Sequence, residues 1–227
     1  MKICTWNMRR SRAAWEWIEH DLDPDIALLQ EVVAPPIALN GTVLWQPIGG
    51  SRRWGSAIYV KRVPVEHLPL DTYHGWVIAA RIRLAPTILL TTLSLHAQII
   101  HSYSITTLHH IFSDLTVLLA HSRYKLVGGD FNAGLLWDKE YNTTTHKILF
   151  DRVEAFGLSN CHRRFHEQEV QTFRNKRGKP WQLDHLFISY RLANKLTSCD
   201  VIDRESLYTF SDHNPIVATL EVDNAKP

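Results

Sequence analysis

The sequence predicts a mixed α/β protein in which two packed β-sheets are covered by outer helices. Short apolar runs rich in β-branched residues recur along the chain, and few stretches show the three- and four-residue spacing of an amphipathic helix. A chain of 227 residues can bury one large core, for which a two-sheet sandwich with outer helices is the natural packing. We expect a single domain over residues 1–222 and a frayed tail over residues 223–227.

The first half of the chain is expected to consist mostly of strands. Between the first two strands, Ser11 is a candidate cap for a helix that carries Trp15 and Ile18 and ends at Pro24. Pro86 separates the last two strands of this half and indicates a hairpin. The predicted strands cover residues 2–7, 25–30, 42–48, 56–60, 76–84 and 87–95.

The second half combines two predicted helices with three more strands. Apolar residues recur at three- and four-residue steps through residues 103–122, which predicts the longest helix. Residues 145–156 form a second amphipathic pattern, and Gly157 can adopt the left-handed conformation that ends a helix. The remaining apolar runs, at residues 124–128, 183–189 and 215–222, are predicted strands.

The composition excludes several classes of protein. Lys and Arg number 25 and Asp and Glu 23, which excludes a wholly basic nucleic-acid binder but allows a local basic patch. The 3 cysteines lack the paired spacing of a zinc site and argue against a disulfide scaffold. No apolar run approaches the ~20 residues of a membrane span, and the N-terminus lacks a signal-peptide core. We therefore expect a cytoplasmic, monomeric protein that does not contact a membrane.

Polar side chains stand where several predicted strands begin or end. In a mixed sandwich, strand ends and strand starts meet on one rim when the two sets of strands run antiparallel. The sequence therefore predicts one cluster of carboxylate, amide and imidazole groups. Its members are Asn7, Glu31, His96 and Asp130 at strand ends, with Asn132 just beyond, and Asp184, Asp212 and His213 at strand starts.

A cluster of this kind suits a hard divalent cation. Several carboxylates on one rim repel each other unless a cation lies among them, and carboxylate oxygens with water prefer Mg²⁺ or Mn²⁺ to zinc. A metal flanked by Asn and His donors is suited to a phosphate. Each residue also has a structural alternative, because an acidic residue at a strand end is more often a turn former and His96 could be a half-buried sheet histidine.

Six short segments carry these residues, in a fixed order along the chain. They are Thr-Trp-Asn-Met (5–8), Leu-Leu-Gln-Glu-Val (28–32), Ser-Leu-His-Ala (94–97), Gly-Gly-Asp-Phe-Asn-Ala (128–133), Leu-Asp-His-Leu-Phe-Ile (183–188) and Ser-Asp-His-Asn-Pro-Ile (211–216). Read together, they resemble the endonuclease/exonuclease/phosphatase superfamily, which has the DNase I-like fold. The resemblance implies a four-layer αββα sandwich, with two mixed β-sheets packed face to face, and metal-assisted hydrolysis of phosphoester bonds.

The resemblance also implies a metal site. Glu31 would bind Mg²⁺ directly, and Mn²⁺ could substitute for it. Asn7 would help position the metal or the phosphate, and Asp212 would belong to the metal site or support it. The tyrosine that many members of the superfamily place beside the phosphate has no clear match in this sequence.

The resemblance implies catalytic roles for the remaining members of the cluster. Asp130 would orient or deprotonate the attacking water, and Asn132 would hold a phosphate oxygen. His213 would contact the phosphate or act as general base, and Asp184 would fix its tautomer. His96 would stabilise charge on the phosphate or the leaving group. Whether the carboxylate or the imidazole takes the proton of the water stays open.

Three basic clusters interleaved with aromatic residues adjoin the six segments. Cations beside aromatic rings suit contact with a phosphate backbone and stacking on bases, although each cluster alone could be a solvated loop. The predicted nucleic-acid contacts are Arg9, Arg10, Arg53, Arg174, Arg177, Lys179 and Trp181. The leading hypothesis is a Mg²⁺-dependent phosphodiesterase acting on nucleic acid, as a DNA endonuclease. The alternatives are a hydrolase of a small-molecule or lipid-headgroup phosphoester and an inactive member that binds nucleic acid or a partner.

Overall fold

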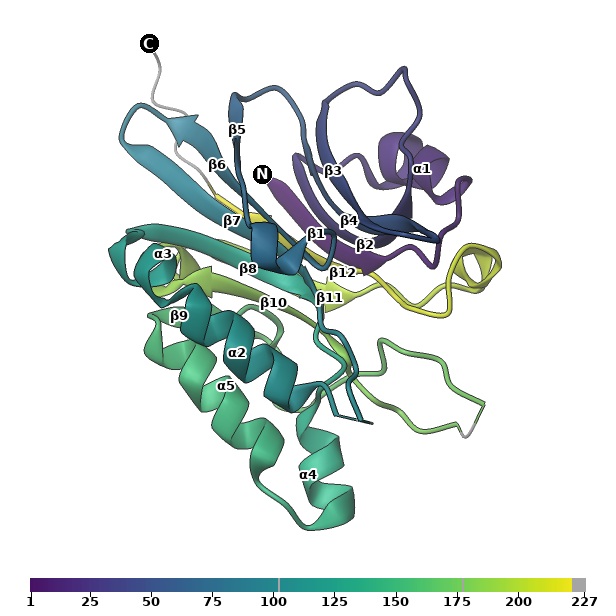
Figure 1. Ribbon diagram of the computed structural model, residues 1–227, viewed down its shortest axis with the longest axis vertical. Helices are drawn as coiled ribbons and strands as arrows, with labels where there is room; N and C mark the ends of the chain where they lie inside the picture. Colours follow the sequence, from purple (N-terminus) through teal and green to yellow (C-terminus); the bar gives the residue numbers. More distant parts are fainter. Residues whose placement is uncertain (102, 177, 222–227) are drawn as a thin grey trace.

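Two six-stranded β-sheets pack face to face in the computed structural model, with helices on their outer faces (Figure 1). The structure describes residues 1–101, 103–176 and 178–221, so the predicted tail 223–227 and Arg177 lie outside the described residues. The layers follow the order helix, sheet, sheet, helix. The predicted α/β sandwich is therefore confirmed.

The first sheet has the strand order β11-β12-β1-β2-β4-β3. Strands β1 and β2 run parallel, and the other neighbouring pairs run antiparallel. The central position of β1 brings its C-terminal end beside β2 on one side and beside the segment that enters β12 on the other. The strands are β1 (Lys2–Asn7), β2 (Ile26–Val33), β3 (Thr42–Gly49), β4 (Arg52–Val60), β11 (Leu196–Val201) and β12 (Ile216–Leu220).

The second sheet has the strand order β5-β6-β7-β8-β10-β9. Its strands are β5 (Val65–Leu68), β6 (Val77–Ala85), β7 (Ile88–His96), β8 (Tyr124–Asp130), β9 (Leu158–Asn160) and β10 (Asp184–Ser189). The parallel pair β7 and β8 sets His96 opposite Asp130, and the antiparallel pair β8 and β10 sets Asp184 opposite Asp130. Three candidate site residues therefore share one end of this sheet.

Helices cover the outer faces of both sheets (Figure 1). The short helix α1 (Ala14–Glu16), continued by a π-helical stretch (Trp17–Leu22), packs on the first sheet. On the second sheet, α2 (Ile105–Asp114) and α5 (Thr145–Ala155) carry the apolar residues that complete the outer layer. The other helices are α3 (Thr116–His121), α4 (Leu135–Tyr141) and α6 (Tyr190–Ala193), with 3-10 turns at Asp71–Tyr73, His162–Arg164 and Glu205–Thr209. Within the described residues, no helix has the length and hydropathy that crossing a bilayer requires.

Alternate residues of the central strands fill two different layers, as the two-residue period of a strand requires. Ile3 of β1 and Leu28 of β2 pack in the core between the sheets. Cys4 and Trp6 of β1 point the other way and pack against α1 and the π-helical stretch. Because both faces of these strands are buried, they appear in the sequence as continuous apolar runs.

Two helical predictions differ from the structure. Residues 103–122 form α2 and α3 rather than one helix, because the backbone of Leu115 leaves the helical conformation at φ −87° and ψ 7°. The side chain of Leu115 stays buried, so the apolar period continues across the break and conceals it. Ser11 does not cap the first helix, which follows Ala13 and has no side-chain cap; the helical segment ends at Asp23, one residue before Pro24.

Several short elements have no counterpart among the predicted ones. Strands β5, β9 and β11 lie at or beside the edges of their sheets, and α4 and α6 contain 7 and 4 residues. The two helices contain less than two turns, and the three strands contain at most three two-residue periods, so the pattern within each element is short. They are stabilised by pairing and packing with distant parts of the chain, which a local pattern does not contain.

Candidate active site

The polar ends of both sheets converge on one rim of the sandwich, and Asp130 at the end of β8 lies at their centre. Its Oδ2 atom is 3.0 Å from Asn7 Nδ2, 3.7 Å from His96 Nε2 and 3.9 Å from His213 Nε2. Gly129 allows β8 to reach this point, because a side chain there would collide with the backbone of β7. Asp130 is 2% exposed, so its charge faces groups from both sheets and little bulk water.

A buried carboxylate–imidazole pair lies next to Asp130. His213 Nδ1 is 2.7 Å from Asp184 Oδ2, and this hydrogen bond leaves Nε2 directed toward Asp130. Burial alone would lower the pKa of His213, but Asp184 and Asp130 outweigh it and raise that pKa. Burial raises the pKa of Asp184, against the effect of His213. The pair therefore holds a proton in a fixed orientation, as carboxylate–histidine pairs do in hydrolases.

The segment that carries His213 is tied to β1 by hydrogen bonds. The Ser211 hydroxyl donates to the backbone carbonyl of Asn7 at 2.7 Å and accepts from the His213 N–H at 3.0 Å. The indole N–H of Trp6 donates to the His213 carbonyl at 2.9 Å. These bonds explain how the Ser-Asp-His motif, more than 200 residues from Asn7, stays in register with the first strand.

Glu31 reaches the rim through an irregularity in β2. Its φ is +49°, and the pairing of β2 with β4 shifts between Leu29 and Val32, as in a β-bulge. The bulge turns the carboxylate toward Asn7, whose Nδ2 lies 3.4 Å from Glu31 Oε1. The amide oxygen of Asn7 accepts a hydrogen bond from the Arg9 N–H at 3.0 Å. Asn7 therefore presents its amide hydrogens, and not its oxygen, to the two carboxylates.

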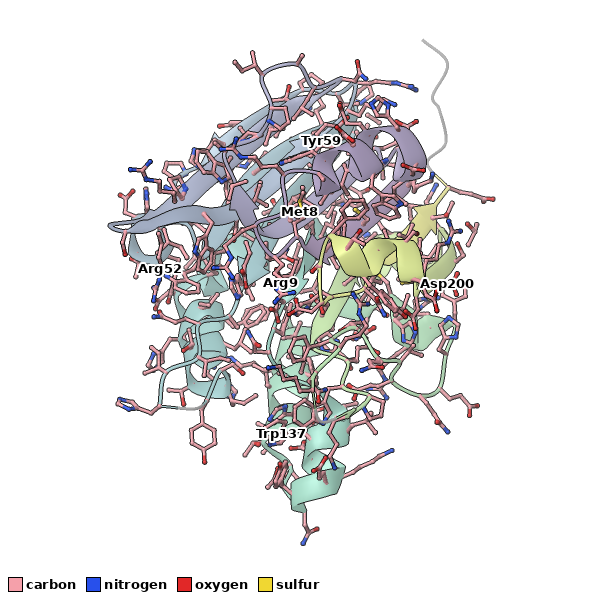
Figure 2. The ribbon with its side chains drawn as sticks, turned by 90° about the vertical axis from the view of Figure 1, so that its right-hand side faces the viewer. Met8, Arg9, Arg52, Tyr59, Trp137 and Asp200 are labelled. Carbon is pink, nitrogen blue, oxygen red and sulfur yellow. The ribbon has the colours of Figure 1, made fainter. Side chains whose placement is uncertain are left out.

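Two arginines pair with the outer carboxylates of the cluster. Arg10 Nε lies 3.2 Å from Glu31 Oε2, and Arg9 Nε lies 3.3 Å from Asp212 Oδ2. Both arginine side chains are about half exposed, at 53% and 55%, so these pairs contribute little to stability. Both residues also have positive φ angles, a conformation that non-glycine residues rarely adopt. Arg9 lies near the middle of Figure 2.

The donor set of the rim fits a hard divalent cation. Asp130, Asp184 and His213 offer ligand atoms within 4.8 Å of one another, a grouping that no other His, Cys, Asp or Glu set in the described residues matches. In that group Asp184 Oδ2 is already bonded to His213, and the carboxylates of Glu31 and Asp130 lie on either side of the Asn7 amide. Carboxylate oxygens with water are the ligands Mg²⁺ prefers.

His96 lies in an aromatic enclosure beside the cluster. Its ring centroid is 5.7 Å from that of Trp54 and 5.2 Å from that of Trp76. Burial lowers the pKa of His96 by more than Asp130 raises it, so the ring is neutral at pH 7. The guanidinium groups of Arg10 and Arg52 lie over the two indoles at 5.9 and 5.6 Å, which places cations on the rim of the site.

Asn132 is held beside Asp130 by its backbone and its side chain. Its N–H donates to Asp130 Oδ1 at 2.9 Å, and its φ is +49°. Its side-chain nitrogen donates to the carbonyl of Ala97 at 3.1 Å. All eight residues of the predicted cluster therefore lie on one rim, with Asn132 at its edge.

The sequence matches the Endonuclease/Exonuclease/phosphatase family over residues 4–213, the span that contains every residue of this cluster. The chain belongs to this family. It is accordingly a hydrolase of phosphoric esters, and the cluster of acidic, amide and imidazole groups is its candidate active site.

Solved structures with the same fold align with almost the whole length of this chain. The endonuclease domain of TRAS1, a telomere-specific non-LTR retrotransposon, is 20% identical, with a TM-score of 0.74 and coverage of 98% of this chain and 99% of that one. An AP endonuclease from Archaeoglobus fulgidus is 19% identical, with a TM-score of 0.74 and coverage of 98% and 100%. A 3′ phosphatase from Neisseria, bound to a product DNA hairpin, is 17% identical, with a TM-score of 0.75 and coverage of 98% and 100%. A comparison with curated protein sequences found no match.

The predicted nucleic-acid contacts of this family member lie in different surroundings. Arg53 is exposed and lines a basic recess of 400 Å³ together with other arginines. Lys179 pairs with Glu140 at 3.0 Å. Arg174 donates to the Ser211 carbonyl and stacks on a tyrosine, so its guanidinium is engaged within the protein. Arg9 and Arg10 lie at the rim, as described above, and Arg177 lies outside the described residues.

A cavity of 310 Å³ opens beside Asn132 and is lined by aromatic and apolar side chains. Trp181, predicted as a nucleic-acid contact, forms one wall and lies 4.8 Å from the ring of Trp137. Phe173 forms another wall, and its ring lies 4.9 Å from that of His213. Figure 2 shows Trp137 on α4, below Arg9. Local patterns did not indicate Trp137 or Phe173 as site residues, because only the folded chain brings them to the rim.

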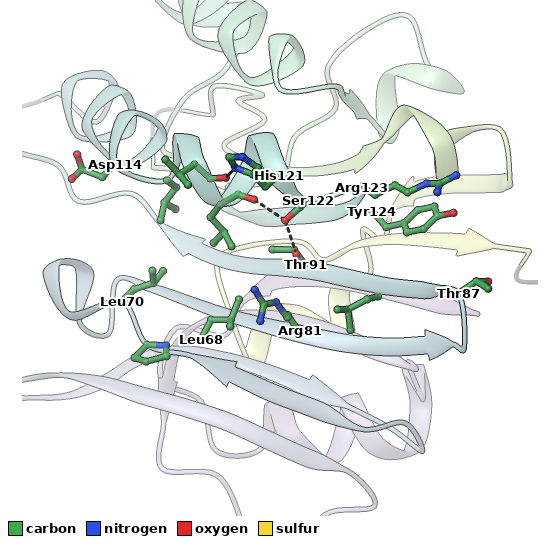
Figure 3. A pocket seen from close by; sticks show the side chains of 15 residues that line it. Leu68, Leu70, Arg81, Thr87, Thr91, Asp114, His121, Ser122, Arg123 and Tyr124 are labelled. Carbon is green, nitrogen blue, oxygen red and sulfur yellow. Dashed lines mark hydrogen bonds between the residues drawn. The ribbon is translucent and has the colours of Figure 1, made fainter.

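A larger cavity, of 750 Å³, lies elsewhere and contains no residue of the cluster. It is a groove between the outer face of the second sheet and α3, where the Ser122 hydroxyl bridges Thr91 and the Leu118 carbonyl (Figure 3). Leu89 and Tyr124 line it near the strand ends opposite His96 and Asp130. The groove therefore has no part in the chemistry of the rim.

Proposed function

We propose that the chain is a Mg²⁺-dependent phosphodiesterase that cleaves nucleic acid, and that it acts as a DNA endonuclease. One observation carries the proposal: the aromatic cavity adjoins the catalytic pair, because the Phe173 ring lines the cavity and contacts His213. A phosphate bound at the rim would then have a neighbouring nucleoside within reach of stacking walls. A small phosphomonoester would leave those walls without a function.

Mg²⁺ would be held by Glu31, with Asn7 orienting its carboxylate. When bound there, the ion polarises a phosphoryl oxygen and stabilises the negative charge of the transition state. Mn²⁺ has the same preference for carboxylate oxygens and would substitute. Asp212, at the exposed side of the site, would support the ion through water or orient Arg9.

The protonation of the pair supports a division of the acid–base roles. Because neighbouring carboxylates raise the pKa of His213, its imidazolium form prevails at neutral pH and donates a hydrogen bond to a phosphate oxygen. Asp130 is then the group that orients the attacking water and accepts its proton. Asp184 keeps the imidazolium in one orientation. Asn132 and the neutral His96 border the phosphate from the other side.

The surroundings of the rim support nucleic acid as the substrate. Arg9, Arg10, Arg52 and Arg53 are exposed on the side of the first sheet, where they could contact successive phosphates. The structural neighbours include an AP endonuclease and a phosphatase bound to a DNA hairpin. Their identity to this chain is too low to transfer a substrate, so they support the choice of nucleic acid without deciding its form.

A substrate panel tests the proposal. Supercoiled plasmid, linear single- and double-stranded DNA, an abasic duplex, RNA and a chromogenic phosphomonoester are incubated with Mg²⁺ or EDTA. Asp130→Asn and His213→Ala proteins are assayed alongside, with Asp151→Asn, an exposed carboxylate of α5, as the matched control. We expect Mg²⁺-dependent nicking that the first two substitutions abolish and the control retains. Cleavage of the phosphomonoester alone would overturn the proposal and favour a small-molecule phosphatase.

A further inference from the structure

The aromatic cavity beside the active site is almost entirely apolar. Ile105, Trp137, Phe173, Trp181 and Leu183 form most of its walls. Walls of this kind accept the flat face of a nucleobase but do not distinguish one base from another, because every base has such a face. Discrimination between bases therefore depends on the polar groups that also line the cavity.

Two of these polar side chains are already engaged. The Ser104 hydroxyl donates to the carbonyl of Asn132 at 2.7 Å. The Asn132 side-chain nitrogen donates to the carbonyl of Ala97 at 3.1 Å. The Ser104 hydroxyl and one amide hydrogen of Asn132 therefore hold the loop that follows β7 against the loop that follows β8, and they shape the cavity.

Tyr103 and His146 also carry polar groups on these walls, and His146, in the first turn of α5, is the buried one of the two. Its Nδ1 accepts a hydrogen bond from the Gly134 N–H at 3.0 Å, which places the proton of the neutral ring on Nε2. Burial lowers the pKa of His146 by more than Asp138 raises it, so the neutral ring prevails. Nε2 makes no hydrogen bond with any described residue.

The orientation of this ring is fixed from two sides. It stacks on Trp137 with 11° between the ring planes and 5.8 Å between the centroids. The backbone N–H groups of His146 and Lys147 donate to the carboxylate of Asp138, which anchors the start of α5. Only 6% of the surface of His146 is exposed, so moving its ring would require repacking of the cavity wall. A fixed N–H donor on an apolar wall is the arrangement that ligand sites use for selectivity.

We propose that His146 is a specificity residue, which donates a hydrogen bond from Nε2 to a carbonyl oxygen of the nucleobase held in the cavity. The inference rests on the proposed function, because it requires a nucleic-acid substrate at the rim. The preferred substrate would be a nucleotide whose base carries a carbonyl group, such as a pyrimidine or guanine. Adenine has no carbonyl oxygen and offers only ring nitrogens as acceptors, and an abasic residue has no base at all and leaves the donor without a partner.

A site built to hydrogen-bond a substrate rejects an analogue that lacks the partner, because the bound analogue would cover the donor and leave it unsatisfied. The comparison that isolates this effect is thymine against difluorotoluene, which has nearly the same shape but no carbonyl oxygen. On an oligonucleotide whose cleavage position has been mapped, we expect wild-type kcat/KM to favour thymine beside the scissile phosphate by roughly tenfold.

The variant series separates donation from packing. In His146→Phe the ring remains but the donor is lost, so the preference for thymine should fall to about one. In His146→Gln the side-chain amide supplies an N–H, and part of the preference should return. His67→Phe, at an exposed histidine of β5, is the matched control and should keep the full preference. Thermal unfolding of each variant checks that the fold survives.

If His146→Phe does not fold, a binding measurement on a protein that retains His146 tests the same hydrogen bond. In the inactive Asp130→Asn protein, the ¹⁵N resonance of His146 Nε2 should shift with a thymine oligonucleotide and not with its difluorotoluene analogue. Equal cleavage of the two by an active wild-type protein would overturn the role of His146 and leave the proposed function intact. Failure to cleave any nucleic acid would overturn the proposed function itself.

Discussion

The side-chain nitrogen of Asn7 lies 3.0 Å from Asp130 Oδ2 and so joins the two sheets at their catalytic edge. Asn7 ends the central strand of the first sheet, and Asp130 ends a central strand of the second. The same amide nitrogen faces Glu31 at 3.4 Å. A neutral donor between two carboxylates relieves their repulsion without occupying the position of a cation.

Asn7→Asp should make stability depend on a divalent cation. The new carboxylate would face Asp130 and Glu31, and the repulsion should cost about 1–3 kcal/mol of unfolding free energy in EDTA. Mg²⁺ should restore most of the loss, which thermal unfolding with and without the ion would measure. Asn40→Asp, at an exposed amide, is the control. Equal stability of the Asn7 variant in both conditions would show that this residue does not separate the carboxylates.

Asp184→Asn should lower the pKa of His213. The carboxylate stabilises the imidazolium through its charge and its hydrogen bond, and burial favours the neutral ring, so removal of the charge should lower the pKa of His213. An NMR titration of the imidazole Cε1–H, assigned by its absence in His213→Gln, measures the change. If the titration of His213 is unchanged, Asp184 does not hold the proton of the pair.

The same pair should affect stability in the alkaline direction. Because the pKa of folded His213 is raised, its stabilising contribution is complete below about pH 6.5 and is lost as the pH rises through the raised pKa. Chemical denaturation of the wild type should show this loss above neutrality. In Asp184→Asn the corresponding fall should be smaller, because only Asp130 and Asp212 would then raise the pKa of His213, and a parallel fall in both proteins would assign it to other groups.

Arg9→Ala and Arg174→Ala should differ in their response to salt. Arg9 is half exposed at the rim, so its removal should reduce the slope of log affinity against log salt by roughly 0.9 for duplex DNA. Arg174 is bonded to the Ser211 carbonyl and to Asn214, so its removal should lower kcat and stability but leave the slope unchanged. Binding isotherms of a DNA duplex at several salt concentrations test both expectations. An unchanged slope for Arg9→Ala would place that residue off the DNA path.

Glu31→Gln should weaken the binding of a divalent cation by roughly tenfold or more, because an ionised ligand becomes a neutral one. Electron paramagnetic resonance of Mn²⁺ measures this affinity without substrate. Glu16→Gln, at an exposed carboxylate of α1, should bind the ion as the wild type does. Equal affinity of the Glu31 variant would move the cation to another carboxylate of the rim.

Local patterns predicted the polar ends of the strands correctly, because each lies directly after or before an apolar run. His96 and Asp130 occupy the last positions of their strands, and Asp184 occupies the first position of its strand. Strand pairing then places the three residues side by side at one end of the sheet. Glu31 was also predicted to follow the end of a strand, but β2 continues past it as far as Val33. The bulge that permits this depends on pairing with β4, which no local pattern contains.

The amino-acid sequence by itself determined the class of the fold, the family and the positions of the polar residues at the strand ends, since apolar periods and short motifs are local properties of the chain. The tertiary structure decided what surrounds that rim. It turned Arg174 inward, separated α2 from α3 at Leu115, and assembled the cavity from Trp137, His146 and Phe173. Those outcomes depend on close packing between segments far apart in the chain, and packing of that kind leaves no periodic trace in the sequence.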